Sequence, residues 1–243
     1  MHRLLGLSLL LALLSSCAVH PERNSDGVWI NQAAINAAVG SHTLRRALWA
    51  NDSIMEWHIN THSGRAVFVS AIERGEGIIT RAVDNQLDVR LDGVNVVELR
   101  VDQGQLFQTQ SLYGPPQRFS KSTGLADAQP GSRFIQALNS AYLDGSWSIV
   151  SGEGQGRFVR FLPDGRVQGL ADNERYQLCL GGDCASMSGA NDSLWLEKSG
   201  KSELWFFVRN GRTLEIFHTV NTARSDEKPV FVSGARRWLL ERQ

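Results

Sequence analysis

The sequence predicts a mostly β protein made of two tandem small antiparallel barrels or sandwiches with short helices. Three observations lead to this fold class. Apolar and polar residues alternate with a period of two in short segments, Gly-containing turn sequences separate these segments, and an Asp-Gly-x-Trp sequence opens each half, at Asp26 and at Asp144. The 243 residues, 42% of them hydrophobic, are enough for two small cores.

The charge balance excludes one class of function. Lys plus Arg and Asp plus Glu each number 25, which gives a formal net charge of +0. A nucleic-acid-binding protein is expected to carry a clear basic excess. We therefore expect no nucleic acid among the partners.

The first seventeen residues are predicted to form a targeting sequence. Arg3 precedes an apolar run from Leu4 to Leu14, which is too short for a hydrocarbon core that needs about 20 helical residues but is typical of a secretory signal. The sequence Leu14-Ser15-Ser16-Cys17 resembles the lipobox of bacterial lipoproteins. This resemblance implies cleavage before Cys17 and acylation of that cysteine. An ordinary signal peptide or a buried apolar segment is the alternative.

The resemblance also implies an anchor and a location. A diacylglycerol on the Cys17 sulfur and an acyl chain on its amine exceed the two chains that suffice for stable membrane anchoring. Ala18 stands where an Asp favours the inner membrane in enteric-type bacteria, so the resemblance implies the outer membrane, with the folded part facing the periplasm. The expected order is a signal peptide at 1–16 and a lipidated tether at 17–25.

The two remaining cysteines, Cys179 and Cys184, are predicted to form a disulfide. The Gly-Gly-Asp sequence between them is typical of a turn, so two strands should fold back and bring the sulfurs together. An oxidising periplasm favours the bond. A redox couple or half of a metal site is the alternative.

The first β-rich domain is expected at 26–120. An Ala-rich stretch that ends at Val39 favours a helix, and Gly40 is a stop signal. Strands follow from Ile54 onward, with clear alternation of apolar and polar residues at 87–92 and 97–102. A turn at Asp102-Gln103-Gly104 leads to a further apolar pair, Leu106 and Phe107.

A linker and connecting helix are expected at 121–143. The stretch from Ser120 to Pro130 is polar and has no periodicity. Ser132 then precedes a helical pattern in which Phe134 and Leu138 share a face. The segment therefore separates two domains.

The second β-rich domain is expected at 144–243. Its predicted strands and turns are 157–162, the turn Pro163-Asp164-Gly165, the pair 194–197 and 204–208 joined through Ser199-Gly200, and a last strand at 237–240. Asn210-Gly211 predicts a hairpin with a type I′ turn, in which both central residues have positive φ.

This second half resembles lipocalin-like (calycin) barrels. Members of that family open their first strand with Gly-x-Trp and pack an Arg from a late strand over the Trp. Gly145 and Trp147 match the first element, and Arg236 or Arg237 could supply the second. The first half departs from the pattern because Trp29 leads into a helical segment. Whether the two halves are repeats stays open.

Aromatic residues near position 205 suggest either a core or a pocket. Leu204 and Phe206 fit one face of a strand, and Trp205 and Phe207 fit the other. A strand that is apolar on both faces is enclosed in a core or lines a pocket. Trp147, Trp205 and Phe207 are therefore the candidate pocket or core aromatics, and a core is the commoner fate of such residues.

No motif indicates catalysis, a metal site or a cofactor. His58 and His62 lie in a turn sequence without a third ligand. Residues 152–156 resemble a phosphate loop only in composition, and no Gly-x-Ser-x-Gly sequence is present. Glu73 and Glu76 fit solvated charges. We therefore predict no catalytic residue, no metal ligand and no cofactor.

The function expected from these observations is a non-enzymatic one. The leading hypothesis is a lipid-anchored envelope lipoprotein that binds an apolar small molecule or an envelope protein through apolar surface in a barrel mouth or groove. An assembly factor that docks onto another outer-membrane protein is the alternative. An envelope hydrolase is a remote third, because active-site residues assemble in space rather than in sequence.

Overall fold

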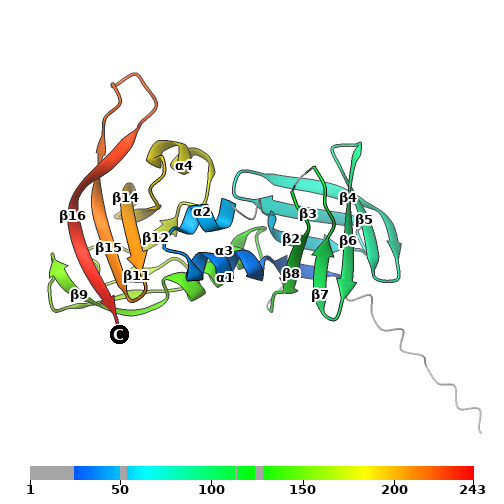
Figure 1. The fold of residues 1–243 in the computed structure, drawn as a ribbon, viewed down its shortest axis with the longest axis horizontal. Coiled ribbons are helices and arrows are strands. Elements are labelled where there is room, and N and C mark those ends of the chain that lie inside the picture. Colours follow the sequence, from blue (N-terminus) through cyan, green and yellow to red (C-terminus); the bar gives the residue numbers. More distant parts are fainter. Residues whose placement is uncertain (1–24, 50–53, 113, 124–127) are drawn as a thin grey trace, which may run out of the picture.

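The computed structural model describes residues 25–49, 54–112, 114–123 and 128–243, and it contains two eight-stranded antiparallel barrel-like sheets (Figure 1). This confirms the mostly β fold and the tandem barrels. The predictions that concern residues 1–24, including the signal peptide, acylation of Cys17 and the inference from Ala18, lie outside the described residues.

The first sheet is a closed barrel in which each strand pairs with the next. Its strands are β1 Gly27–Ile30, β2 Ile54–Asn60, β3 Arg65–Ser70, β4 Arg74–Val83, β5 Gln86–Leu91, β6 Asn95–Asp102, β7 Gln105–Gln108 and β8 Gln117–Lys121. Pairing of Trp29 with Lys121 between β1 and β8 closes the barrel, so each described strand of this sheet has a paired neighbour on both sides.

The side chains of alternate strand residues fill the interior of the first barrel. Leu87, Val89 and Leu91 of β5 point inward and are buried, as the period of two predicts. Trp29 and Trp57 are also almost completely buried in this core. The predicted turn after Asp102 is present, with φ of 48° at Gln103 and 75° at Gly104.

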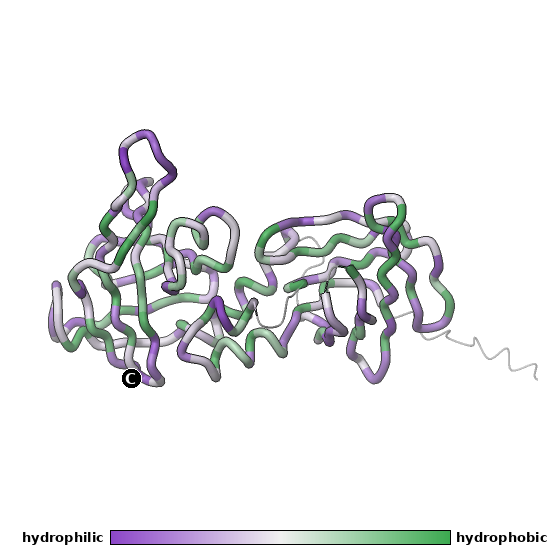
Figure 2. The backbone as a smooth tube through the Cα atoms, turned by 45° about the horizontal axis from the view of Figure 1, so that its top comes forward, coloured by the Kyte–Doolittle hydropathy of each residue, from purple (hydrophilic) through white to green (hydrophobic). Residues whose placement is uncertain are grey.

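The second sheet follows the same neighbour-to-neighbour plan. Its strands are β9 Gly145–Gly152, β10 Phe158–Phe161, β11 Val167–Gln168, β12 Arg175–Leu178, β13 Ser193–Lys198, β14 Lys201–Asn210, β15 Thr213–Asn221 and β16 Phe231–Arg242. β9 pairs with β16, and an isolated antiparallel bridge between Arg166 and Arg175 brings the two ends of the sheet together. The β15–β16 hairpin projects beyond this barrel, and its tip is hydrophilic (Figure 2).

The described helices are α1 Gln32–Gly40, α2 Leu44–Trp49, α3 Ser132–Tyr142 and α4 Gly182–Ser188, and the first three lie between the barrels (Figure 1). The predictions of α1 and α3 are confirmed, whereas α2 and α4 were not predicted. Although α1 and α2 follow β1 in the chain, their buried residues, such as Ile35 and Leu44, belong to the same core cluster as the second sheet. Among the described residues, no helix is both long and apolar enough to cross a membrane.

The disulfide between Cys179 and Cys184 is present, with sulfurs 2.10 Å apart, but the expected hairpin around it is wrong. Cys179 follows β12, and Cys184 lies in α4, which begins at Gly182. A turn-like Gly-Gly-Asp sequence also suits the start of a helix, where an early Asp is favourable. The bond therefore fastens a strand to a helix.

The turn after β14 also differs from its prediction. Asn210 pairs with Thr213, so the central residues are Gly211 and Arg212, and only Gly211 of these two has positive φ, at 56°. A glycine at the first central position is what a type II′ turn requires. The hairpin is confirmed, but its turn lies one residue later than Asn210-Gly211.

The two barrels are closed by similar contacts at one end. In the first, Lys121 Nζ lies 5.4 Å from the centre of the Trp29 ring. In the second, Arg242 Cζ lies 5.4 Å from the centre of the Trp147 ring. In each barrel the cation comes from the last strand and the Trp from the first.

The assignment of Arg236 or Arg237 to Trp147 is therefore wrong. Arg236 Nη1 bonds to Glu215 Oε2 at 2.6 Å, and Arg237 pairs with Glu153. The β16 strand continues past Trp238, and its far end, at Arg242, is the part that pairs with Trp147. The register of β16 against β9 decides which arginine lies over the Trp147 ring, and the sequence spacing alone does not determine this register.

Candidate functional site

The first barrel has one closed end and one end with a pocket. Gly27 pairs with Ile59, and Ile30 pairs with Glu56, so β1 starts beside the end of β2 and runs toward its beginning. The Trp29–Lys121 contact thus closes the end where the described chain begins. A pocket of about 850 Å³ lies at the opposite end, beside Ile54, the first residue of β2.

We call this cavity the mouth pocket. Its floor is formed by Ile54, Met55 and Phe68, which are buried apolar residues of β2 and β3. Leu48 and Trp49 of α2 form one wall. The turn between β3 and β4 and the segment between β7 and β8 complete the lining. A concave, mostly apolar surface of this size is the usual form of a small-molecule site.

Gly75 of β4 allows the Phe68 ring to form this floor. A Cβ atom at Gly75 would lie 2.1 Å from Phe68 Cε1, a separation that real Cβ atoms do not show. The ring therefore occupies the space that any other residue at position 75 would need. Trp57 supports the ring from inside the barrel, with ring centres 5.6 Å apart.

Three large apolar side chains at the rim are exposed. Ile72 and Leu112 are each 84% exposed, and Trp49 is 49% exposed. Single exposed apolar residues are common, but three that line one concave apolar pocket are the kind of exposed apolar surface that marks a binding site. A ligand that covers this rim would remove apolar area from water.

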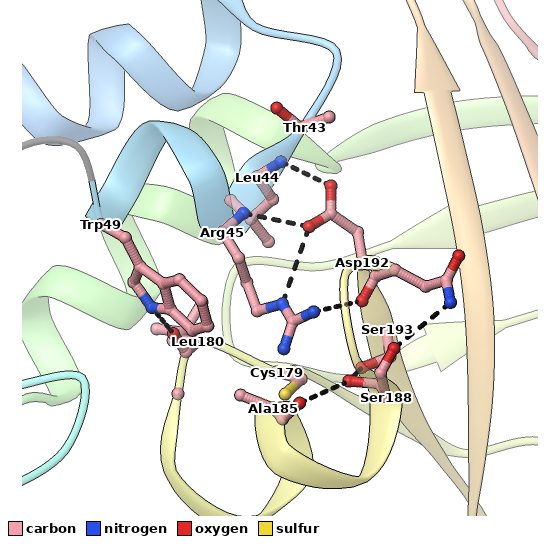
Figure 3. A network of polar contacts seen from close by, with 12 residues as sticks. Thr43, Leu44, Arg45, Trp49, Cys179, Leu180, Ala185, Ser188, Asp192 and Ser193 are labelled. Atoms are coloured by element: carbon pink, nitrogen blue, oxygen red, sulfur yellow. Dashed lines mark hydrogen bonds and ion pairs between the residues drawn. The ribbon is translucent and has the colours of Figure 1, made fainter. Parts of the chain in front are cut away.

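Trp49 is fixed by the second half of the protein. Its indole Nε1–H donates to the carbonyl oxygen of Leu180 at 3.1 Å, and Arg45 Cζ lies 5.1 Å from the ring centre (Figure 3). Leu180 lies inside the loop that the Cys179–Cys184 disulfide closes. The wall of the mouth pocket in one barrel is thus held by a loop of the other.

A buried carboxylate of the second half caps α2. Asp192 accepts hydrogen bonds from the backbone N–H groups of Leu44 at 2.5 Å and Arg45 at 3.0 Å, at the start of the helix (Figure 3). Arg45 Nη2 donates to the carbonyl of Asn191 at 2.7 Å. Burial raises the pKa of Asp192, and the two N–H bonds and the charge of Arg45 oppose that shift.

A carboxylate of the first barrel caps α3 in the same way. Glu56 of β2 is completely buried and accepts hydrogen bonds from the N–H groups of Gly131 at 2.7 Å and Phe134 at 2.6 Å. Because Gly131 stands at the N-cap and has no side chain, Glu56 supplies the missing acceptor. His58 also contacts the Glu56 carboxylate. Each half of the protein therefore caps one of these two helices, and both helices pack into the core cluster of the second sheet.

A second, smaller pocket of about 200 Å³ lies between the halves. It shares Met55, Ser70 and Ala71 with the mouth pocket and also contacts the disulfide loop. A Cβ atom at Gly181 would lie 2.5 Å from the carbonyl oxygen of Ala71. Glycine at this position is thus what allows the loop to approach the mouth pocket so closely.

The aromatic residues predicted as pocket or core are all in the core. Trp147 is completely buried, and Trp205 and Phe207 are 8% and 2% exposed within the core cluster of the second sheet. Trp205 packs against Trp238, with ring centres 5.1 Å apart. None of the three lines either pocket described above.

The residues that do line the mouth pocket carry no sequence signal that predicts this role. Ile72 and Leu112 are single apolar residues in the connections after β3 and after β7, and nothing in their local pattern distinguishes them. Glu73, interpreted as a solvated charge, lies at the rim. Glu76 pairs with Arg74 at 2.9 Å.

The two histidines considered as metal ligands lie on different parts of one hairpin. His58 is in β2 beside Glu56, and His62 is in the turn before β3. Within the part of the chain that the structure describes, no group of three or more His, Cys, Asp or Glu residues is arranged to hold a metal ion.

Comparison with known proteins does not add to this description. No family model, no curated protein and no solved structure matches this chain.

Proposed function

We propose that this protein is a lipid-anchored envelope protein that binds an apolar ligand in the mouth pocket of its first barrel. The observation that carries the proposal is the pocket of about 850 Å³ with its buried apolar floor and exposed rim of Trp49, Ile72 and Leu112. Burial of apolar surface would supply most of the affinity.

The anchor is proposed from the sequence Leu14-Ser15-Ser16-Cys17 and from its resemblance to the lipobox. The outer membrane, with the folded part in the periplasm, is proposed from Ala18. A Cys17→Ser variant tests the anchor. We expect it to lose acyl labelling and membrane fractionation, and unchanged labelling and fractionation would contradict the proposal.

The resemblance of the second half to lipocalin-like barrels is likewise proposed. The contact between Trp147 and Arg242 supports it, because the Trp lies on the first strand and the Arg on the last. In this proposal the second barrel, whose interior holds aromatic core residues, acts as the support that orients α2 and Trp49.

Binding is tested by titration of the purified protein with N-phenyl-1-naphthylamine, an uncharged apolar fluorophore. We expect saturable binding that Ile72→Glu and Leu112→Glu each weaken about tenfold or more, since a large apolar side chain that the bound ligand covers contributes ~1.5–3 kcal/mol.

The matched control is Val94→Glu. Val94 is 85% exposed, close to the exposure of Ile72, but it does not line the mouth pocket. We expect the control to bind the fluorophore as the unsubstituted protein does. Absence of saturable binding, or equal losses in all three variants, would rule out this function.

A further inference from the structure

The charges around the mouth pocket limit the kind of ligand that it can take. Glu73 is the single ionisable residue among the lining residues that the structure describes. Glu73 is exposed, and none of the ion pairs found among the described residues includes it, since the neighbouring Arg74 pairs with Glu76 instead. Any polar end of a ligand that rests at this rim meets an unneutralised negative charge.

The basic residues nearby are engaged elsewhere. Arg74, next to Glu73 in the chain, bonds to Glu76 at 2.9 Å. Arg45 covers the ring of Trp49, but its guanidinium is directed into the second half, where it bonds to the Asn191 carbonyl. Arg46, the other basic residue of α2, is not among the lining residues. No described residue thus offers the mouth pocket the Arg or Lys contact on which recognition of carboxylates and phosphates usually depends.

The polar groups of the turn between β3 and β4 are also used internally. Ser70 Oγ accepts hydrogen bonds from the N–H groups of Ile72 at 3.2 Å and Glu73 at 3.0 Å, and it donates to the Glu73 carbonyl at 3.2 Å. These backbone N–H groups are therefore not available to an anion. The exposed residues of this turn that line the mouth pocket are Ile72 and Glu73, one apolar and one acidic.

We propose that the mouth pocket binds apolar molecules whose polar end carries no negative charge. This inference rests on the proposed function and specifies its ligand. A fatty acid or an anionic phospholipid would place its charged group against Glu73 without a compensating cation. An uncharged apolar molecule avoids that repulsion, and a cationic amphiphile gains a partner.

Three competitors of equal chain length test the inference. Decanol, decylammonium and decanoate are used below their micellar concentrations to displace N-phenyl-1-naphthylamine from the purified protein at low ionic strength and neutral pH. We expect decanoate to displace the fluorophore about two- to fivefold less well than decanol, a range set by the strength of exposed charge pairs. Decylammonium should compete at least as well as decanol.

A substitution tests whether Glu73 causes the expected difference in displacement between the three competitors. In Glu73→Gln, decanoate and decylammonium should displace the fluorophore almost equally well. The control is Glu98→Gln, a change at an exposed glutamate of β6 outside the pocket, which should leave the difference between the two competitors intact. Added salt should reduce the difference in the unsubstituted protein.

The possible failures are distinguishable. If decanoate competes as well as decanol, or if Glu73→Gln leaves the difference unchanged, the charge inference is overturned while apolar binding stands. If decanol also fails to displace a fluorophore that binds in the mouth pocket, or if no fluorophore binds at all, the proposed function fails and the inference fails with it.

Discussion

The indole N–H of Trp49 donates a hydrogen bond to the carbonyl of Leu180, 3.1 Å away, across the boundary between the two halves of the protein. The donor lies at the rim of the mouth pocket, and the acceptor lies inside a loop of six residues that begins and ends at a disulfide-bonded cysteine. The orientation of a half-exposed tryptophan in one barrel is therefore tied to the conformation of a covalently closed loop in the other.

Removal of the disulfide should weaken ligand binding. In a Cys179→Ala, Cys184→Ala double variant the Leu180 carbonyl is no longer held, and Trp49 loses part of a hydrogen bond worth ~0.5–1.5 kcal/mol. We expect the affinity for N-phenyl-1-naphthylamine to fall about two- to tenfold. Chemical unfolding should also show a loss of about 2 kcal/mol, the entropic value for a loop this short.

Trp49→Phe is the matched control for this prediction, because it removes the N–H but keeps an aromatic ring at the rim. Combined with the double cysteine variant, it should cause little further loss of affinity, since both changes act through the same bond. Fully additive losses would show that the disulfide acts on the pocket by another route.

Gly181→Ala should destabilise the contact between the halves. The added methyl group would lie 2.5 Å from the Ala71 carbonyl oxygen, and relief of such an overlap typically costs ~1–3 kcal/mol. Denaturant unfolding measures the cost. Gly40→Ala is the control, because a Cβ there meets nothing within 4 Å, and a loss as large in the control would contradict the steric explanation.

The sequence predicted the elements whose signals are local. Leu87, Val89 and Leu91 alternate with charged residues, and they form a half-buried strand as that pattern requires. Ser132 to Tyr142 carries an apolar face and forms α3. The disulfide between Cys179 and Cys184 was also predictable, because their short spacing in the chain keeps the two sulfurs near each other.

The elements that were missed depend on contacts distant in the chain. The six-residue helix α2 begins where Asp192, more than a hundred residues later, accepts its first N–H groups. The α3 helix is capped by Glu56 rather than by its own N-cap residue. The mouth pocket combines a helix and several strand connections that only closure of the barrel brings together, so no local pattern could have indicated it.

The stability of the protein should vary with pH through Asp192. Burial raises the pKa of this carboxyl in the folded protein above its ordinary value of 3.8, so the folded state holds the proton more tightly than the unfolded chain does. The contribution of Asp192 to the free energy of unfolding should therefore fall as pH rises from 3.8 through the raised pKa, and should increase as pH falls through the same window.

Comparison with Asp192→Asn isolates this contribution, because asparagine does not titrate. The free energy of unfolding of the natural chain minus that of the variant, measured by urea unfolding across the acidic range, should decrease with rising pH. An increase would show that the N–H bonds from Leu44 and Arg45 outweigh the cost of burying the charge.

The free energy of unfolding should depend on the cations that lie over the tryptophans at the closed ends of the barrels. Arg242→Met removes the guanidinium that lies 5.4 Å from the Trp147 ring centre and that donates to the Asp144 carbonyl. A cation over an aromatic ring contributes ~0.5–1 kcal/mol at a partly exposed site, and the carbonyl loses a charged donor, so we expect a loss of about 1–2 kcal/mol in thermal or urea unfolding. Arg236→Met, which breaks only a surface ion pair with Glu215, should cost no more than about 0.5 kcal/mol. Equal losses in the two variants would show that the last arginine of β16 has no special part in closing the barrel.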